Sequence, residues 1–162
     1  MKYFPLIAAI CLALSSPMTV LAQNGPVDWK TIATEFSKDE AAATAKYQGK
    51  MLTVVGPVSS IAGGDMTVDD PSVAVTLSTT DGPGPDVKCL FEPEDLEPNT
   101  EVHVTGDSTE AQLRNLSPAG KVLSSRPMVQ IGQAVTVSGT FLGYQAGDIV
   151  LRHCRLADGG GE

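Results

Sequence analysis

The hydrophobic periodicity of this chain changes at Lys50, and the change constrains the fold more than any other feature. Over residues 28–47, apolar side chains recur at the spacing of one helical face, beginning with Trp29, Ile32, Ala33 and Phe36. From Met51 to Ile61 the period becomes two, and the residues that share a face are Leu52, Val54 and Val58. The chain is therefore predicted to begin with an amphipathic helix that leads directly into a long strand.

Local signals define the helix at 28–47. Asp28 can act as its N-cap, because an aspartate side chain accepts a hydrogen bond from a free amide of the first turn. Residues 37–40 match a capping box, which allows the helix to restart there. Trp29, Phe36 and Tyr47 resemble a set of base-stacking aromatics, but at helical spacing they indicate a face that packs on a sheet.

Short strands and turns are expected over the rest of the chain. Alternating apolar residues predict four more principal strands, at about 73–77, 87–91, 135–141 and 149–156. A shorter strand is expected at 101–105. Ser108 as an N-cap predicts a helix over 108–117, and Pro118 and Gly120 would end it. Residues 118–131 fit either an irregular link or an extra edge strand.

Together these elements predict a mainly β protein with an OB-fold-like, five-stranded Greek-key barrel over residues 28–157. The amphipathic helix precedes the barrel, and a short extra helix is expected between the third and fourth strands. Gly56 and Pro57 interrupt the first strand, which predicts a bend or bulge there. A β-sandwich of this length would need more strands. Residues 158–162 read as a flexible tail.

The N-terminus predicts export. A single lysine precedes an apolar run at 6–14 that is too short to span a bilayer, and Val20-Leu21-Ala22 suits signal-peptide cleavage. We expect a signal peptide at 1–22, a polar leader at 23–27 and no transmembrane segment after cleavage. The expected location is the periplasm, rather than a secreted or lipid-anchored state; an uncleaved membrane anchor is the alternative.

Charge argues against a nucleic-acid partner. The formal net charge of the 162-residue chain is −8, and removing residues 1–22 takes away Lys2 and no acid, which leaves −9. A protein this acidic repels polyanions unless its basic residues cluster. Lys46, Lys50, Lys88, Arg152 and Arg155 are the residues that could form such a cluster.

Five short segments resemble a known family in order and spacing. They are residues 45–50, 54–58, 87–91, 132–139 and 150–154, which read AKYQGK, VVGPV, VKCLF, GQAVTVSG and VLRHC. Over about residues 29–156 the chain resembles the tRNA-anti-like family of bacterial OB-fold domains. The resemblance implies an exported or lipid-anchored protein, and the family's name rests on fold analogy rather than an activity. Residues 92–131 are longer than the link usual in the family.

Two cysteines, Cys89 and Cys154, remain after removal of the signal peptide. In OB topology the third and fifth strands are neighbours, so these cysteines would lie on adjacent strands. Because exported proteins favour disulfides, we expect a Cys89–Cys154 bridge, with two separately buried thiols as the alternative.

The sequence predicts neither a metal site nor a catalytic centre. His153 and Cys154 are consecutive and would point to opposite faces of a strand. Asp65, Asp69 and Asp70 read as a solvated turn. The acidic run of Glu92, Glu94, Asp95 and Glu97 reads as surface charge, and no nucleophile elbow, phosphate loop or dinucleotide motif is present. We therefore expect a protein that is not an enzyme and needs no cofactor.

What remains is a non-catalytic binding or interaction module. Its partner would be a small ligand, a glycan or an envelope protein, and the alternative is a single-stranded nucleic acid or tRNA. The residues expected to form the binding face and its loop are Lys50, Lys88, Phe91, Phe141, Tyr144 and Arg152.

Overall fold

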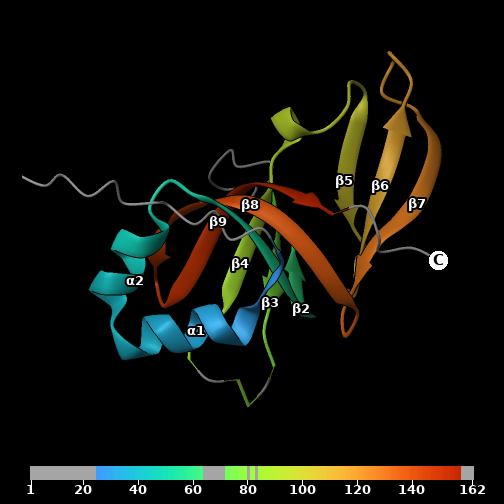
Figure 1. Ribbon diagram of the computed structural model, residues 1–162. Helices are drawn as coiled ribbons and strands as arrows, with labels where there is room; N and C mark the ends of the chain where they lie inside the picture. Colours follow the sequence, from blue (N-terminus) through green and yellow to red (C-terminus); the bar gives the residue numbers. More distant parts are fainter. Residues whose placement is uncertain (1–24, 64–71, 80, 83, 158–162) are drawn as a thin grey trace, which may run out of the picture.

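The computed structural model describes residues 25–63, 72–79, 81–82 and 84–157 (Figure 1). The predicted signal peptide, the acidic turn at 65–70 and the predicted tail at 158–162 lie outside these residues. Within the described part, no helix combines the length and the apolar character needed to cross a membrane.

Two helices form where one was predicted. A two-residue strand, β1 (Val27–Asp28), precedes α1 (Trp29–Lys38), and α2 (Glu40–Tyr47) follows. Asp28 caps α1, and its Oδ1 accepts a hydrogen bond from the amide of Lys30 at 2.8 Å. Asp39 adopts an extended conformation that breaks the helix, and its side chain caps α2 by accepting from the amide of Ala42 at 2.9 Å. The predicted restart is therefore confirmed, with Asp39 rather than Ser37 as the cap.

The predicted five-stranded barrel is confirmed. Its strands are β2 (Met51–Ala62), β3 (Val73–Leu77), β4 (Val87–Phe91), β8 (Ala134–Gln145) and β9 (Asp148–Leu156). They follow the order β2-β3-β4-β9-β8, and pairing of β2 with β8 closes the barrel. All these pairs are antiparallel except β4 and β9, which run parallel, as the Greek-key crossover requires.

The bend predicted in the first strand lets β2 belong to both sides of the barrel. Residues 51–57 pair with β8, whereas the pairs from Val58 onward are with β3. Pro57 marks the transition, since its carbonyl accepts a hydrogen bond from Ser78 at 3.1 Å beyond the end of β3. A proline is tolerated here because the strand leaves one ladder and joins the other.

Helix α1 packs its apolar stripe onto the barrel. Its four buried residues are Trp29, Ile32, Ala33 and Phe36, as the periodicity predicted. Phe36 stacks on Tyr144 of β8, with ring centroids 5.6 Å apart, and lies 5.7 Å from Phe141 of the same strand. These aromatic contacts join the helices and the sheet in one core.

Two glycines make room for the indole of Trp29. A Cβ atom on Gly56 would lie 2.5 Å from Cδ1 of Trp29, and one on Gly82 would lie 2.3 Å from its Cη2. Real Cβ atoms do not approach other atoms this closely, so any side chain at either position would displace the indole. The glycine in β2 is therefore as much a packing requirement as a bend.

The segment between β4 and β8 differs from the prediction. Residues 108–117 do not form a helix; they lie in β6 (Glu110–Leu116), the central strand of an antiparallel sheet with β5 (Thr100–Val104) and β7 (Val122–Gln130). Ser108 is not a helix cap, because it has φ 56° in a tight turn where Asp107 accepts hydrogen bonds from the amide and hydroxyl of Thr109. The strand near 101–105 and the edge-strand interpretation of 118–131 are confirmed. We call the β5-β6-β7 sheet the arm.

The arm extends from the barrel on the side away from the two helices (Figure 1). Ala111 of β6 and Val129 of β7 are fully buried and belong to the same core as the barrel. The arm is thus fixed at its base, while its distal part carries little buried apolar surface.

Replacing Gly56 tests the packing of Trp29. We expect Gly56→Ala to lower the free energy of unfolding by about 1–3 kcal/mol, because the added methyl group collides with the indole. Urea unfolding followed by tryptophan fluorescence measures the loss. Gly143→Ala in β8 is the matched control, since its Cβ would have its nearest neighbour at 3.9 Å. Equal destabilisation by the two substitutions would contradict the packing argument.

Candidate functional site

A β-bulge in β9 places two functional side chains on the outside of the barrel. Ser138 of β8 pairs with Arg155 and Thr140 with Arg152, so two residues of β9 oppose Gly139 alone. His153, one of the two, has φ 52°, in the left-handed region. As a result Arg152 and His153 both lie outside the barrel, while Cys154 returns to the core.

Gly139 is required opposite this bulge. A Cβ atom there would lie 2.6 Å from Sγ of Cys154 and 3.1 Å from the carbonyl oxygen of Arg152. The glycine of the 132–139 motif therefore allows the bulge to form, and the bulge sets the direction of Arg152 and His153.

Glu92, directly after β4, meets these side chains from the neighbouring strand. Its side chain is only 7% exposed, and Oε1 bonds to Nε and Nη2 of Arg152, whose side chain is 42% exposed. The guanidinium thus neutralises a desolvated carboxylate while keeping part of its own surface in water. Because the acidic run was predicted to be solvated, the burial of Glu92 is a correction.

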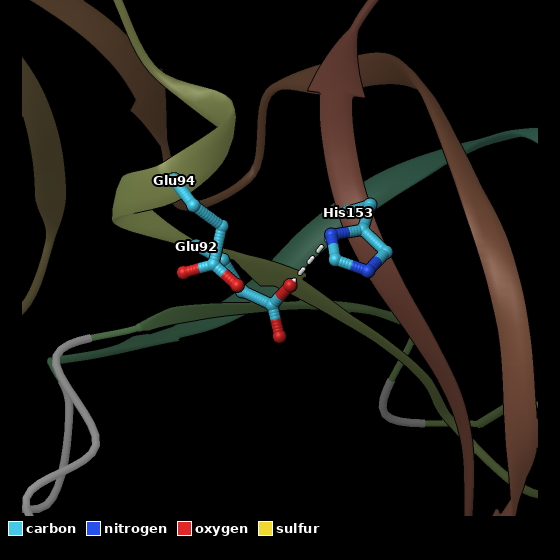
Figure 2. A group of neighbouring side chains, drawn as sticks. All are labelled: Glu92, Glu94 and His153. Atoms are coloured by element: carbon cyan, nitrogen blue, oxygen red, sulfur yellow. Dashed lines mark ion pairs between the residues drawn. The ribbon is translucent and has the colours of Figure 1, made fainter. Parts of the chain in front are cut away.

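His153 faces two carboxylates at once. Its Nδ1 lies 2.8 Å from Oε2 of Glu92 and 2.9 Å from Oδ2 of Asp95, which is largely buried. The short helix η1 (Pro93–Asp95) turns the chain so that Glu94 and Asp95 come back over Glu92. Figure 2 shows Glu92 and Glu94 beside one another, with the imidazole ring facing them from β9.

Charge in this group is only partly balanced. Arg155 is the second cation nearby, with Nη2 3.9 Å from Oδ1 of Asp95 and a side chain that is 71% exposed. We call Glu92, Glu94, Asp95, Arg152 and His153 the rim cluster. The cluster contains three carboxylates, of which that of Glu92 is the most buried, together with one firmly paired arginine and one imidazole. Such a group can bind a cation or the polar groups of a partner.

The sequence contained a signal for the rim cluster that motif reasoning missed. By the alternation of a strand, Glu92 falls on the same face as Lys88 and Leu90, which is the outer face of β4. OB topology makes β4 and β9 neighbours, so an acid at the end of β4 falls beside the Arg152-His153 pair. Only the bulge, which puts two consecutive residues on one side, was not visible in the alternation.

The structure does not gather the six predicted ligand residues on one face. Phe91 and Phe141 are 3% and 2% exposed and belong to the core, so they offer no surface to a ligand. Tyr144 is covered on one side by Phe36. Phe141 and Tyr144, which were predicted for binding, instead hold α1 against the barrel through Phe36.

The three predicted cationic residues are also dispersed. Lys50 is exposed just before β2, and Arg152 is held by Glu92. Lys88 lies on the outer face of β4 near two acids. Burial raises the pKa of Asp148 there, the charge of Asp86 adds to the rise, and the charge of Lys88 opposes it. Lys46 forms an ion pair with Glu35 at 2.6 Å.

The structure does not contain the predicted Cys89–Cys154 disulfide: both cysteines are buried, free thiols. In the pairing of β4 with β9, Cys89 lies opposite Leu151. Cys154 is three residues further along β9, at the bulge, and is not the direct cross-strand partner of Cys89. The thiol of Cys154 donates instead to the carbonyl of Leu151 at 3.5 Å. A hydrogen bond with Cys154 and burial raise the pKa of Cys89, so its thiol is protonated.

The outer strand of the arm is the second candidate site. β7 lies at the edge of its sheet and, in the part of the chain that the structure describes, pairs only with β6. Residues 122–127 are all exposed, including the apolar side chains of Val122 and Leu123, whereas Val129 is buried. An exposed edge strand presents unpaired N–H and C=O groups that another chain can pair with.

Replacing Arg152 tests the ion pair at the rim. We expect Arg152→Met to cost about 2–4 kcal/mol of unfolding free energy, because it leaves the carboxylate of Glu92 buried without its countercharge. Glu92→Gln should lower the unfolding free energy by less, since the side chain of Arg152 can then rotate into solvent. In the double variant the losses should fall short of their sum by at least about 1 kcal/mol. Strict additivity in denaturant unfolding would show that the pair contributes nothing.

Comparison with known proteins agrees with this architecture. The family model described as tRNA_anti-like matches residues 22–155, which span both helices, the barrel and the arm. No curated protein and no solved structure matched the chain. Since the match extends over well more than half of the sequence, the chain belongs to the tRNA_anti-like family.

Proposed function

We propose that this chain is an exported, non-catalytic interaction module that binds another protein through the edge strand of its arm. The observation that carries the proposal is the stretch of six consecutive exposed residues in β7, 122–127, on a strand with one free edge. The barrel supports this strand, because the base of the arm is anchored in the core through Ala111 and Val129.

The backbone of β7 is suited to pairing with an extended segment. Pro127 pairs with Gln112 of β6 beside a register shift at Met128, and an edge strand tolerates a proline, which has no N–H to donate, at such a place. By the alternation of a strand, we expect the amide of Ser125 to point the same way as the nitrogen of Pro127, toward the free edge, whereas Leu123 is the residue left out of the pairing with β6 at a second register shift. A partner strand could bond to this edge and cover the apolar side chain of Leu123.

A protein partner fits these features better than the other ligand classes. The free backbone groups and exposed side chains of β7 are spaced along a strand. This spacing matches an extended peptide rather than a compact small molecule or glycan. Binding of single-stranded nucleic acid needs exposed aromatic rings and free cations. Here Phe91 and Phe141 are buried and Arg152 is held by Glu92, in a chain of net charge −8.

Mass spectrometry of the protein from its native cells tests the export part of the proposal. We expect an intact mass that corresponds to residues 23–162, because the signal peptide at 1–22 is removed. Alkylation without reductant should add nothing to the folded protein and two groups after denaturation, at Cys89 and Cys154. A full-length mass would refute export, and no uptake after denaturation would show that the cysteines are bridged.

Site-specific photo-crosslinking tests the partner surface. A photoreactive amino acid at Leu123, which is 66% exposed, should capture one defined protein in intact cells. The same group at Met51, which is 76% exposed on the barrel, is the matched control and should not capture it. Ser125→Pro should abolish the crosslink, because it removes an edge amide while the ladder to β6 stays intact.

Three outcomes would overturn the proposal. Equal capture of the same protein from both positions would mean that β7 is not the contact. Crosslinking only to a second copy of this chain would replace the partner by self-association. Retention of the crosslink in Ser125→Pro, with the arm still folded by hydrogen exchange, would exclude strand pairing.

A further inference from the structure

The rim cluster contains more acceptor atoms than its hydrogens can satisfy. Oε2 of Glu92 is buried and accepts no hydrogen bond from any residue that the structure describes. It lies 2.8 Å from Nδ1 of His153, but that nitrogen bonds to Oδ2 of Asp95. Nδ1 carries at most one hydrogen, so one carboxylate oxygen faces it without a proton between them. Such an arrangement favours a positive charge among these atoms.

Glu94 completes a set of donor atoms around the same point. One ligand atom each from Glu92, Glu94 and His153 lie within 4.8 Å of one another. Figure 2 shows the two carboxylates on one side and the imidazole opposite them. The three come from two elements, the β4–η1 turn and β9, that are hydrogen-bonded neighbours in the barrel wall.

We propose that Glu92, Glu94 and His153 bind a divalent transition-metal cation of the Zn²⁺ type. One imidazole nitrogen with two carboxylate oxygens suits zinc, and the imidazole disfavours Mg²⁺ and Ca²⁺, which prefer oxygen ligands alone. Three protein ligands leave a coordination position that water, Asp95 or a group from a partner can fill.

The fold holds two of these ligands in place before the cation arrives. Glu92 cannot rotate into solvent, because Arg152 fixes Oε1 and leaves Oε2 directed at His153. The left-handed backbone at His153 fixes the imidazole on the outside of the barrel. Glu94 is exposed and needs only a change of rotamer to reach the cation, so binding has to order only one side chain.

The charge of the neighbours permits a dication. Glu92, Glu94 and Asp95 carry three negative charges, against those of Arg152 and the largely exposed Arg155. With a neutral imidazole the group keeps a net negative charge. Arg152 lowers the affinity for a cation, but it also shields the oxygen of Glu92 that the metal does not use.

Isothermal titration of the purified, tag-free full chain with Zn²⁺ tests the site. We expect one equivalent to bind, and Glu94→Gln and His153→Asn each to weaken binding about tenfold or more. Asparagine tolerates the left-handed conformation, so His153→Asn removes the imidazole without straining the bulge. Glu97→Gln, an exposed acid of the same run, is the matched control and should bind as the parent does.

Binding of Co²⁺ in place of Zn²⁺ distinguishes coordination at this site from coordination by the two thiols. Coordination by nitrogen and oxygen should give visible d–d bands without the thiolate-to-cobalt charge-transfer band that Cys89 and Cys154 would produce. Circular dichroism and thermal unfolding show that each variant is folded. Absence of binding by the folded parent, a thiolate band, or equal weakening in Glu97→Gln would overturn the proposal.

Discussion

The bulge of β9 opposite Gly139 is the constraint on which the rest of the barrel surface depends. Regular alternation would place either Arg152 or His153 inside the barrel, where an unpaired charge or imidazole would be costly. The extra residue instead turns both outward and returns Cys154 to the core beside Cys89. The absence of a side chain at Gly139 therefore permits both the packing of the thiols and the formation of the rim cluster.

Periodicity predicted the barrel because β3, β4 and β8 each bury a single face, as β2 does up to its bulge. The five strands, the bend at Gly56-Pro57 and the buried stripe of α1 all follow from it. The helix at 108–117 was wrong for a physical reason: β6 is paired on both sides, and its ladders outweigh the weak helical pattern of Leu113 and Leu116. Local propensity cannot detect such pairing, because the partner strands lie in a segment with few apolar residues.

The candidate sites were less predictable than the fold. Phe141 and Tyr144 were expected to bind a ligand because aromatic rings on an OB barrel often do, yet here α1 occupies that position and Phe36 covers them. Glu92 was expected to be solvated because it opens a run of acids. Its burial depends on a guanidinium from a residue 60 positions away, which no local pattern contains.

The long segment between β4 and β8 contributes to both candidate sites, and the barrel explains why it can. The segment leaves at Glu92, which Arg152 holds against β9, and returns at the turn where the amide of Gly132 donates to the carbonyl of Val58 at 2.7 Å. With both ends fixed to barrel strands, the residues between them can form η1 and the arm without disturbing closure. An insertion anchored in this way provides two of the proposed cation ligands, Glu92 and Glu94, at its start and a free strand edge at its far side, while the barrel remains closed.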